Sequence, residues 1–258
     1  MKIEIVVPVF NEEERLAESL PKLHQFVAGM GLPSWRILIA NNGSTDRTHE
    51  VAEQLRRRFA GVEVVWIPKK GRGGALKKIW LGSEADILAY MDVDLAAGLQ
   101  GFPALVQAVA SGEGDLAIGS RLLPGSKTHR SLRRELISRC YLALAKVLCG
   151  VTCSDTQCGF KAMSRVAAQA LLPKVEDAGW FFDTELLLIA QKAGYKVVEI
   201  PVEWKENTDT RVRIVSTAWG DLKGLLRLRR ELRRGATFDN QMAPGRMSAF
   251  RSHERDLS

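Results

Sequence analysis

The chain has 258 residues, 46% of them hydrophobic, and a formal net charge of +7 at pH 7. These values allow one domain with a proper core, or one domain with a small appendage. No apolar run approaches the roughly 20 residues that cross a bilayer, which excludes a spanning helix, and we therefore expect a soluble or at most peripheral protein.

The first third of the chain alternates strand and helix patterns. Short β-branched runs predict strands over residues 3–9, 35–40, 62–67 and 87–91. Asn11, followed by three glutamates, predicts the start of a helix that runs towards residue 30, and a second helix ends near residue 60. Strands and helices that alternate at this spacing predict a doubly wound, mostly parallel sheet flanked by helices.

Past residue 120 the pattern loosens. We predict further helices and strands over residues 101–111, 115–120, 132–150, 181–193 and 195–204. A basic amphipathic helix follows over residues 216–234, and residues 235–258 have few large apolar side chains and no period, so we expect disorder there. Residues 1–215 are thus expected to form the main domain.

Most of the excess positive charge lies near the end of the chain. From residue 222 onward nine Lys or Arg stand against four acids, so this part carries +5 of the total +7. Such a balance favours a phosphate ligand, an acidic membrane surface or a nucleic acid as partner. The helix over 216–234 can lie in a membrane interface, or its leucines can pack on the domain while its arginines face water.

The four cysteines lie between residues 140 and 158 without the paired spacing of zinc sites. We expect reduced, mostly buried thiols in a cytosolic protein. Because Met1 leads directly into a strand pattern, we expect no leader peptide.

Two aspartates follow the apolar strand over residues 87–91. In a strand, residues i and i+2 point to the same side, so Asp92 and Asp94 present their carboxylates together. The carboxyl ends of such strands are where ligands bind, and a carboxylate pair there suits a divalent cation that bridges to a phosphate. The alternative is that one acid caps the next helix and the other is solvated.

Glycines and cations alternate after the third predicted strand, in the run KKGRGGALK. The spacing matches neither the P-loop nor the dinucleotide fingerprint, which argues against a Rossmann oxidoreductase. The backbone beside Arg72 can still approach an anion, and we expect Arg72 to contact substrate, although a plain tight turn fits the motif equally well.

Several arginines follow the strand over residues 115–120, on the same side of the sheet as the aspartate pair. This polar stretch begins at Arg121, ends at Arg134 and also contains Arg130 and Arg133. Guanidinium groups bind phosphate oxygens in pairs, so the stretch can hold more than one phosphate. A solvated basic face is the alternative.

The runs VVPVFNEEE, NNGSTDRT, GRGGALK, DVD, GSR and DTQCGFK occur in this order. The ordered set resembles family 2 glycosyltransferases of the GT-A fold, and more narrowly the polyprenyl-phosphate (dolichyl-phosphate) hexose synthases. DTQCGFK, FFDTELLLIAQ and PVEWKE are most similar to the dolichyl-phosphate β-glucosyltransferases. The resemblance covers residue 3 to about residue 234.

The resemblance implies a nucleotide pocket lined by Pro8, Phe10 and Glu12. Asn41 and Asn42 stand where the family usually has two aspartates, one of which holds the base. Since amides pair with several base edges, this departure leaves the nucleotide open.

For the reacting groups, the resemblance implies that Asp92 and Asp94 hold Mg²⁺ or Mn²⁺ on the donor diphosphate. Arg121 and Arg134 would bind phosphates, and Ser138 would be a further donor to the lipid phosphate.

Four further residues receive roles in the same way. Arg211 and Arg213 would close over the diphosphate from a mobile loop. Asp155 and Asp183 would hold sugar hydroxyls or the arginines, and Asp183 as a general base is the weaker alternative.

The resemblance thus implies an inverting hexosyltransferase that moves glucose from UDP-glucose to a polyprenyl phosphate at the cytoplasmic face of a membrane. A phosphate monoester is largely ionised near neutral pH, so it can attack without a strong general base. Ala96 lies where mannose-transferring relatives can carry glutamine, which favours the glucose branch.

Three alternatives remain. One is a polyprenyl-phosphate mannose synthase that uses GDP-mannose, or a transferase of an N-acetylhexosamine. The second is a transferase with a glycan hydroxyl as acceptor, for which Asp183 would be the essential base. The third is a nucleic-acid-binding module, which is opposed because the Lys and Arg of the tail are not interleaved with stacking aromatics and no nucleic-acid-binding motif appears.

Overall fold

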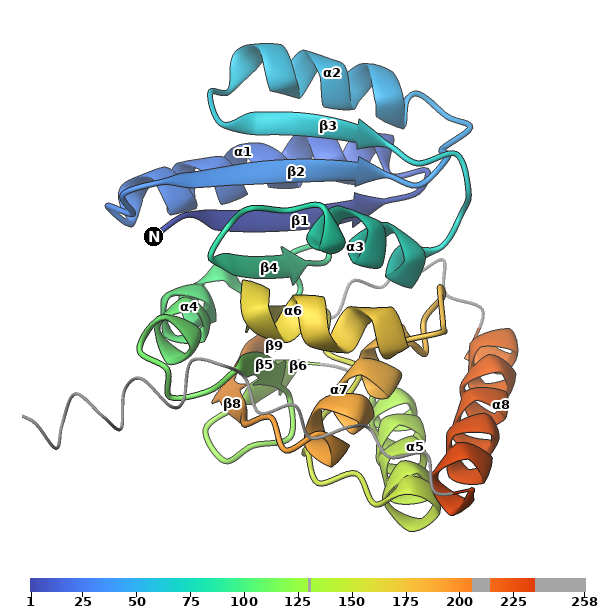
Figure 1. Cartoon of the computed structure of the whole chain (residues 1–258). Helices are drawn as coiled ribbons and strands as arrows, with labels where there is room; N and C mark the ends of the chain where they lie inside the picture. Colours follow the sequence, from blue (N-terminus) through green and yellow to red (C-terminus); the bar gives the residue numbers. More distant parts are fainter. Residues whose placement is uncertain (130, 206–213, 235–258) are drawn as a thin grey trace, which may run out of the picture.

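Seven strands form a central sheet in a computed structural model of the chain, which describes residues 1–129, 131–205 and 214–234 (Figure 1). The strands are β1 (Ile3–Val9), β2 (Trp35–Asn41), β3 (Val62–Trp66), β4 (Ile87–Met91), β5 (Leu116–Ser120), β7 (Phe160–Ser164) and β8 (Val197–Pro201). Their order across the sheet is β3-β2-β1-β4-β7-β5-β8, and β7 runs antiparallel to both of its neighbours. The predicted mixed, mostly parallel sheet is confirmed.

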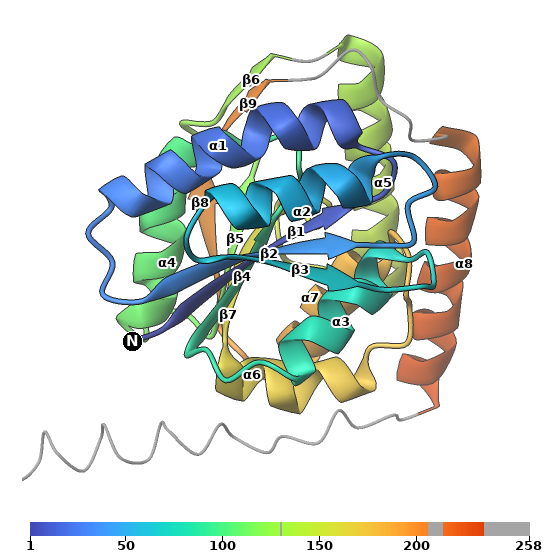
Figure 2. The same cartoon turned by 90° about the horizontal axis from the view of Figure 1, so that it is seen from above.

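Helices cover both faces of this sheet. They are α1 (Glu13–Gly29), α2 (Thr48–Arg58), α3 (Arg72–Leu81), α4 (Phe102–Ala110), α5 (Leu132–Cys149), α6 (Arg165–Leu171), α7 (Phe182–Lys192) and α8 (Ile214–Arg233), with single 3₁₀ turns η1 (Leu99–Gly101) and η2 (Leu172–Lys174). α1, α2 and α4 lie on one face and α3, α6 and α7 on the other, with α5 and α8 extending that second layer (Figure 2).

The strands are apolar throughout because both of their faces are covered. Successive side chains of β1 alternate between the two cores, with Ile5 and Val7 under α1 and Val6 in the core on the other face. β1 is therefore buried along its whole length.

The first helix begins later than the sequence predicts. α1 starts at Glu13, while Asn11 has a positive φ of 56°. The Asn11 Oδ1 atom accepts a hydrogen bond from the Thr45 backbone N–H at 2.7 Å. The residue therefore ties two loops together instead of capping the helix.

The second half departs from the prediction in its strands. β7 and α6 were not predicted, and the strand predicted over residues 195–204 is split. β8 ends at Pro201, and β9 (Glu203–Lys205) leaves the sheet to pair with β6 (Lys127–His129). The Lys205 N–H donates to the Ala96 carbonyl oxygen at 2.9 Å, which fixes β9 beside the loop that follows β4.

The C-terminal helix α8 packs on α5 and on the domain core. Leu225 and Leu228 are fully buried. A Cβ atom at Gly224 would lie 2.3 Å from the Phe181 ring, so the helix approaches that ring as closely as glycine allows. Arg227 is ion-paired with Glu185 at 2.7 Å.

None of the helices in the described part of the chain is long and apolar enough to cross a membrane. Three of the cysteines are buried free thiols, as expected, and Cys140 on α5 is exposed.

Candidate active site

Two carboxylates follow the buried strand β4 at the carboxyl edge of the sheet. The Asp92 N–H donates to the Gly159 carbonyl oxygen at 3.0 Å, and Asp94 Oδ1 accepts a hydrogen bond from the Ala96 N–H at 3.1 Å. Both acids line one pocket, whose apolar wall comes from Leu95, Ala96, Ala97, Phe160 and Trp204. The structure thus brings the predicted carboxylate pair to one open site.

Several charged groups act on the carboxyl of Asp92. Burial raises the pKa of the Asp92 carboxyl to about 6; the Arg72 guanidinium opposes this shift and the Asp94 charge adds to it. Arg72 Nη2 lies 3.1 Å from Asp92 Oδ1, and the Asp92 side chain remains 31% exposed. A second cation between Asp92 and Asp94 would relieve the repulsion of these two charges.

Arg72 belongs to a buried charge cluster of Arg72, Tyr90, Lys161 and Asp183. Its Nη1 lies 3.1 Å from Asp183 Oδ2, and its Nη2 donates to the Tyr90 hydroxyl at 2.8 Å. The Tyr90 hydroxyl donates to Asp183 Oδ1 at 2.5 Å, and Lys161 Nζ lies 3.1 Å from the same oxygen. Asp183 therefore pairs with both Arg72 and Lys161, and Arg72 also pairs with Asp92.

Asp183 is enclosed by this cluster. It is 2% exposed, and both of its oxygens have partners, because Oδ2 pairs with Arg72 and Oδ1 accepts a hydrogen bond from Tyr90. Sequence reasoning missed Lys161 and Tyr90. Tyr90 had a signal, because it stands in β4 two residues before Asp92, and a strand period of two predicts the same side for both.

The glycines of the run GRGGALK serve packing. A Cβ atom at Gly73 would lie 2.4 Å from the Phe182 Cβ, so α3 can approach α7 this closely only with glycine there. The Gly74 N–H donates to the Ala178 carbonyl oxygen at 3.0 Å. Gly73 and Gly74 therefore lie inside α3 and serve its packing, not a tight turn, while the Arg72 side chain reaches Asp92.

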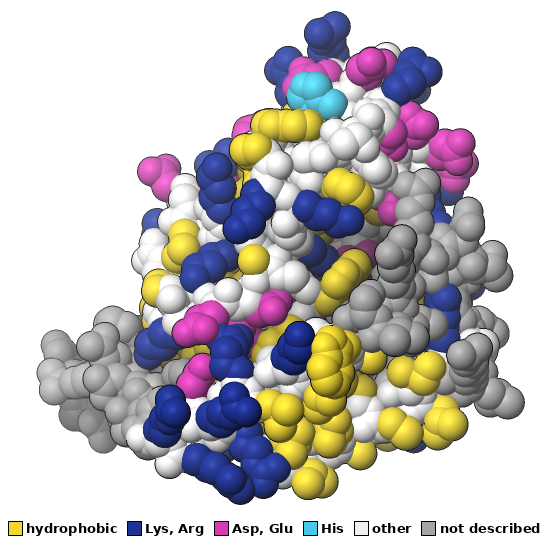
Figure 3. Space-filling view, turned by 90° about the vertical axis from the view of Figure 1, so that its right-hand side faces the viewer, with side chains coloured by type: hydrophobic (Ala, Val, Ile, Leu, Met, Phe, Trp, Pro, Cys, Tyr) yellow, Lys and Arg dark blue, Asp and Glu magenta, His cyan; other side chains and the backbone are white. Residues whose placement is uncertain are grey.

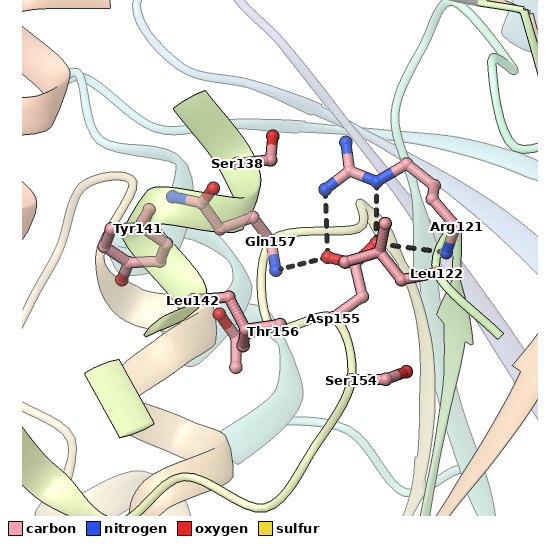
Figure 4. A pocket seen from close by; sticks show the side chains of 9 residues that line it. All are labelled: Arg121, Leu122, Ser138, Tyr141, Leu142, Ser154, Asp155, Thr156 and Gln157. Carbon is pink, nitrogen blue, oxygen red and sulfur yellow. Dashed lines mark hydrogen bonds and ion pairs between the residues drawn. The ribbon is translucent and has the colours of Figure 1, made fainter. Parts of the chain in front are cut away.

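Arg121 is held in a fixed orientation by Asp155 and contacts Trp204, which lines the pocket of Asp92 and Asp94. Its Nε and Nη2 atoms bond the two Asp155 carboxylate oxygens at 2.6 and 2.9 Å, and its third guanidinium nitrogen points away from Asp155 (Figure 4). Burial alone would raise the pKa of Asp155, but Arg121 outweighs burial and the pKa is lowered. The Arg121 guanidinium stacks on Trp204, 4.7 Å from the ring centroid.

Trp204 therefore joins the two halves of the site, because it lines the pocket of Asp92 and Asp94 and also contacts Arg121. Sequence reasoning missed this residue. The run PVEWKE carries only a resemblance, and nothing local in it indicates that β9 folds back over the loop after β4.

A second pocket lies between α5 and the loop before β7 (Figure 4). Arg121, Ser138, Tyr141 and Asp155 are among its lining residues. Arg134 lies one turn before Ser138 on α5, on the same side of the helix. Arg121 and Ser138 thus meet in one pocket as expected, while Arg211 and Arg213 lie outside the described residues.

The residues expected to bind the nucleotide gather at the carboxyl ends of β1 and β2. Val9 is paired with Asn41, and the Asn42 N–H donates to the Val9 carbonyl oxygen at 2.9 Å. Pro8 is buried in β1, and Lys70 Nζ lies 3.8 Å from the ring centroid of Phe10.

Two buried polar atoms at this edge have no partner in the described part of the chain. Asn41 Oδ1 accepts from the Ser44 N–H at 3.0 Å, which leaves Asn41 Nδ2 as an unsatisfied donor, and Asn42 Oδ1 is an unsatisfied acceptor. The backbone N–H of Glu12 lies nearby and contacts Thr48 Oγ1 at 2.8 Å. Unsatisfied buried groups of this kind are costly unless a ligand pairs them.

The acidic pocket fits a hard cation that is shared with a ligand. Within residues 1–129, 131–205 and 214–234, no three acids, histidines or cysteines gather closely enough to enclose a metal ion by themselves. Asp92 and Asp94 supply two carboxylates, and Mg²⁺ is usually held by one or two carboxylates together with substrate phosphates and water. The donor set therefore matches Mg²⁺ or Mn²⁺ that arrives with a diphosphate.

Gly159→Ala is expected to abolish activity. An alanine Cβ would lie 1.8 Å from Asp92 Oδ2, so the carboxylate must move out of its position. We expect at least about a hundredfold loss of turnover, because misplaced catalytic groups cost that much. Steady-state turnover checks this, with Gly29→Ala as the control, since nothing lies within 4 Å of its Cβ. A variant with native turnover would contradict the assigned position of Asp92.

Residues 4–172 match the sequence profile described as "Glycosyl transferase family 2". The chain belongs to this family. The chain is also 35% identical to the glycosyltransferase AglD of Haloferax volcanii over 232 residues. This match covers 88% of this chain and 37% of AglD. The chain is 32% identical over 223 residues to the human dolichyl-phosphate beta-glucosyltransferase, covering 80% of this chain and 68% of that protein. The chain thus spans well under half of AglD.

The glycosyltransferase fold has solved counterparts. A structure of glucosyl-3-phosphoglycerate synthase from Mycobacterium tuberculosis with UDP superposes with a TM-score of 0.66 at 22% identity, covering 88% of this chain and 80% of that one. Another, with Mn²⁺, UDP-glucose and phosphoglyceric acid, has a TM-score of 0.64 at 20% identity, with coverages of 88% and 79%. The expected GT-A fold is confirmed.

Proposed function

We propose that this protein transfers a hexose from a nucleotide sugar to a polyprenyl phosphate with inversion at the anomeric carbon. The observation that carries the proposal is the joining of an acidic pocket and a fixed arginine through one tryptophan. Asp92 and Asp94 line the pocket, Trp204 forms part of its wall, and Arg121 stacks on Trp204. Such a site can hold a donor diphosphate on one side and an anionic acceptor on the other.

Uracil fits the nucleotide edge of the site. Asn41 Nδ2 is an unsatisfied donor and Asn42 Oδ1 an unsatisfied acceptor. A C(=O)–NH edge pairs with one donor and one acceptor; uracil and guanine have this edge, whereas adenine and cytosine do not. The solved structures of similar fold contain UDP or UDP-glucose, which favours uracil over guanine.

The leaving group and the acceptor are both anionic, so positive charge is the main requirement. Mg²⁺ or Mn²⁺ held by Asp92 and Asp94 would supply Lewis-acid stabilisation to the departing nucleoside diphosphate. Arg121, held in place by Asp155, offers its outward nitrogen to a phosphate without reorganisation. Arg134 and Ser138 would add donors from α5.

A phosphate acceptor also agrees with the absence of an accessible base at Asp183. The Asp183 carboxylate is buried and is bonded by Arg72, Lys161 and Tyr90, so it is not exposed to a hydroxyl acceptor. A phosphate oxygen is already ionised and needs no base. This argument favours the lipid phosphate over a glycan hydroxyl.

The transferred sugar is proposed to be glucose. Several relatives of the chain bear the name dolichyl-phosphate beta-glucosyltransferase, among them the human and the Saccharomyces cerevisiae proteins. Mannose from GDP-mannose is the second candidate, since guanine shares the base edge described above. The acceptor would be met at the cytoplasmic face of a membrane, with the protein bound there peripherally.

A donor panel tests the proposal. UDP-glucose, GDP-mannose and UDP-N-acetylglucosamine are each incubated with a short polyprenyl phosphate and Mg²⁺, and nucleoside diphosphate release is measured. We expect release from UDP-glucose that requires the acceptor and stops on addition of a chelator. Release from GDP-mannose alone would replace glucose by mannose. Release with a glycan acceptor and none with the lipid phosphate would overturn the proposal.

A further inference from the structure

Exposed apolar side chains gather on the outer side of α5. Leu136, Leu144 and Val147 are 63%, 38% and 80% exposed. Their spacing of eight and three residues places them on one side of the helix. The opposite side of α5 is used internally, since Ala145 and Cys149 belong to the core.

α8 continues this surface. Trp219 and Leu226, seven residues apart, are 58% and 39% exposed, while Leu225 and Leu228 on the other side of the helix are buried. α5 and α8 pack against one another. We call Leu136, Leu144, Val147, Trp219 and Leu226 the α5–α8 apolar face; hydrophobic side chains gather on this side of the molecule in Figure 3.

Basic side chains border the α5–α8 apolar face. Lys223 lies over Trp219, with its Nζ 5.3 Å from the ring centroid, and Arg230, Arg233 and Lys146 are exposed. Lys and Arg gather beside the apolar side chains in Figure 3. Apolar side chains beside Lys and Arg are typical of surfaces that lie in the interface of an anionic bilayer. The charge complementarity between these Lys and Arg side chains and anionic headgroups favours lipid as the partner.

The same helix reaches the pocket of Arg121. Ser138 and Tyr141 line that pocket, whereas Leu136 and Val147 face outward on the same helix. α5 therefore connects the outward apolar side chains with the pocket of Arg121.

We infer that the α5–α8 apolar face inserts into the interface of an anionic membrane and so presents the Arg121 pocket to a lipid-borne phosphate. The inference rests on the proposed function for its acceptor, but the membrane contact itself is independent of the sugar and the nucleotide. It assigns the contact to α5 as well as to the basic helix α8.

The test compares two double variants of the full chain. Leu136→Ser with Val147→Ser removes two side chains of the face, and the control Leu81→Ser with Val166→Ser removes two apolar side chains on α3 and α6 that are 39% and 49% exposed. Binding to phosphatidylcholine vesicles with and without phosphatidylglycerol is measured by co-sedimentation. We expect the first variant to lose at least about tenfold in affinity for the phosphatidylglycerol vesicles and the second to bind as the unchanged chain does.

A second set of measurements tests the effect of charge on vesicle binding and the effect of the face on activity. Arg230→Gln with Arg233→Gln should weaken binding only to phosphatidylglycerol vesicles, and added salt should do the same. The Leu136→Ser, Val147→Ser variant should glycosylate a short, water-soluble polyprenyl phosphate at the unchanged rate and a long-chain acceptor in vesicles several-fold more slowly.

The outcomes separate the two proposals. Vesicle binding that depends on the face, with no transfer to any acceptor, would leave the membrane contact standing and remove the proposed function. Vesicle binding that the face variants leave unchanged would overturn the inference. A dimer of the unchanged chain that the same variants dissociate, without any vesicle binding, would also overturn it and make a second copy the occupant.

Discussion

Asp94→Asn is expected to lower turnover by about a thousandfold while the protein stays folded. Asparagine keeps an Oδ1 atom that can accept the Ala96 N–H, as Asp94 does at 3.1 Å, so the turn after β4 should persist. The substitution removes the negative charge that the pocket of Asp92 and Asp94 directs at a cation. Nucleoside diphosphate release and a thermal unfolding curve, measured side by side, check both parts of the expectation.

The matched control is Asp86→Asn. Asp86 is an exposed carboxylate at the opposite end of β4 that accepts a hydrogen bond from the Lys2 N–H at 2.7 Å, far from the pocket residues in the strand. We expect native turnover for it. Full activity of Asp94→Asn in the presence of a chelator would remove the metal role from this site.

Asp183→Asn is expected to lower the free energy of unfolding by about 3–5 kcal/mol. The Asp183 carboxylate is buried and neutralises Arg72 and Lys161. In the variant, these two cations would face one another, and Asp92 would be the one carboxylate still paired with Arg72. Unpaired buried charge is among the most destabilising changes a core can receive. Urea unfolding followed by circular dichroism measures the loss.

The double variant Lys161→Met, Asp183→Asn distinguishes a structural cluster from a catalytic base. Because it removes one cation with the carboxylate, we expect it to be less destabilised than the sum of the two single variants. If Asp183→Asn instead unfolded like the unchanged protein and lost turnover with a changed pH profile, Asp183 would be the base. A glycan hydroxyl would then replace the polyprenyl phosphate as the proposed acceptor.

The positions of site residues could be predicted where these residues directly follow a strand. The period of two places Asp92 and Asp94 on one side, and the carboxyl ends of β1 and β4 meet because parallel strands share a direction. Asn41 and Asn42 were assigned to the nucleotide pocket only by the resemblance, and the structure places Asn41 beside Val9 of β1. The sequence could not show that two of their side-chain atoms are left without a partner.

The partners of these groups could not be predicted, since they come from distant parts of the chain. Arg121 and Asp155 were both expected in the site, but their double hydrogen bond depends on how the loop before β7 lies against β5. Lys161 reaches Asp183 because β7 enters the sheet beside β4, and no local pattern marks β7 as a strand between β4 and β5.

By itself, the sequence determined the alternation of strands and helices, the covered sheet and the acidic pair at its carboxyl edge, because these depend on local periodicity. Only the tertiary structure decided which cation meets which carboxylate, that Trp204 closes the acidic pocket, and that α8 packs by one side while its other side stays exposed. The physical reason is that charge pairing and burial are set by contacts between residues far apart in the chain, which local propensity does not encode.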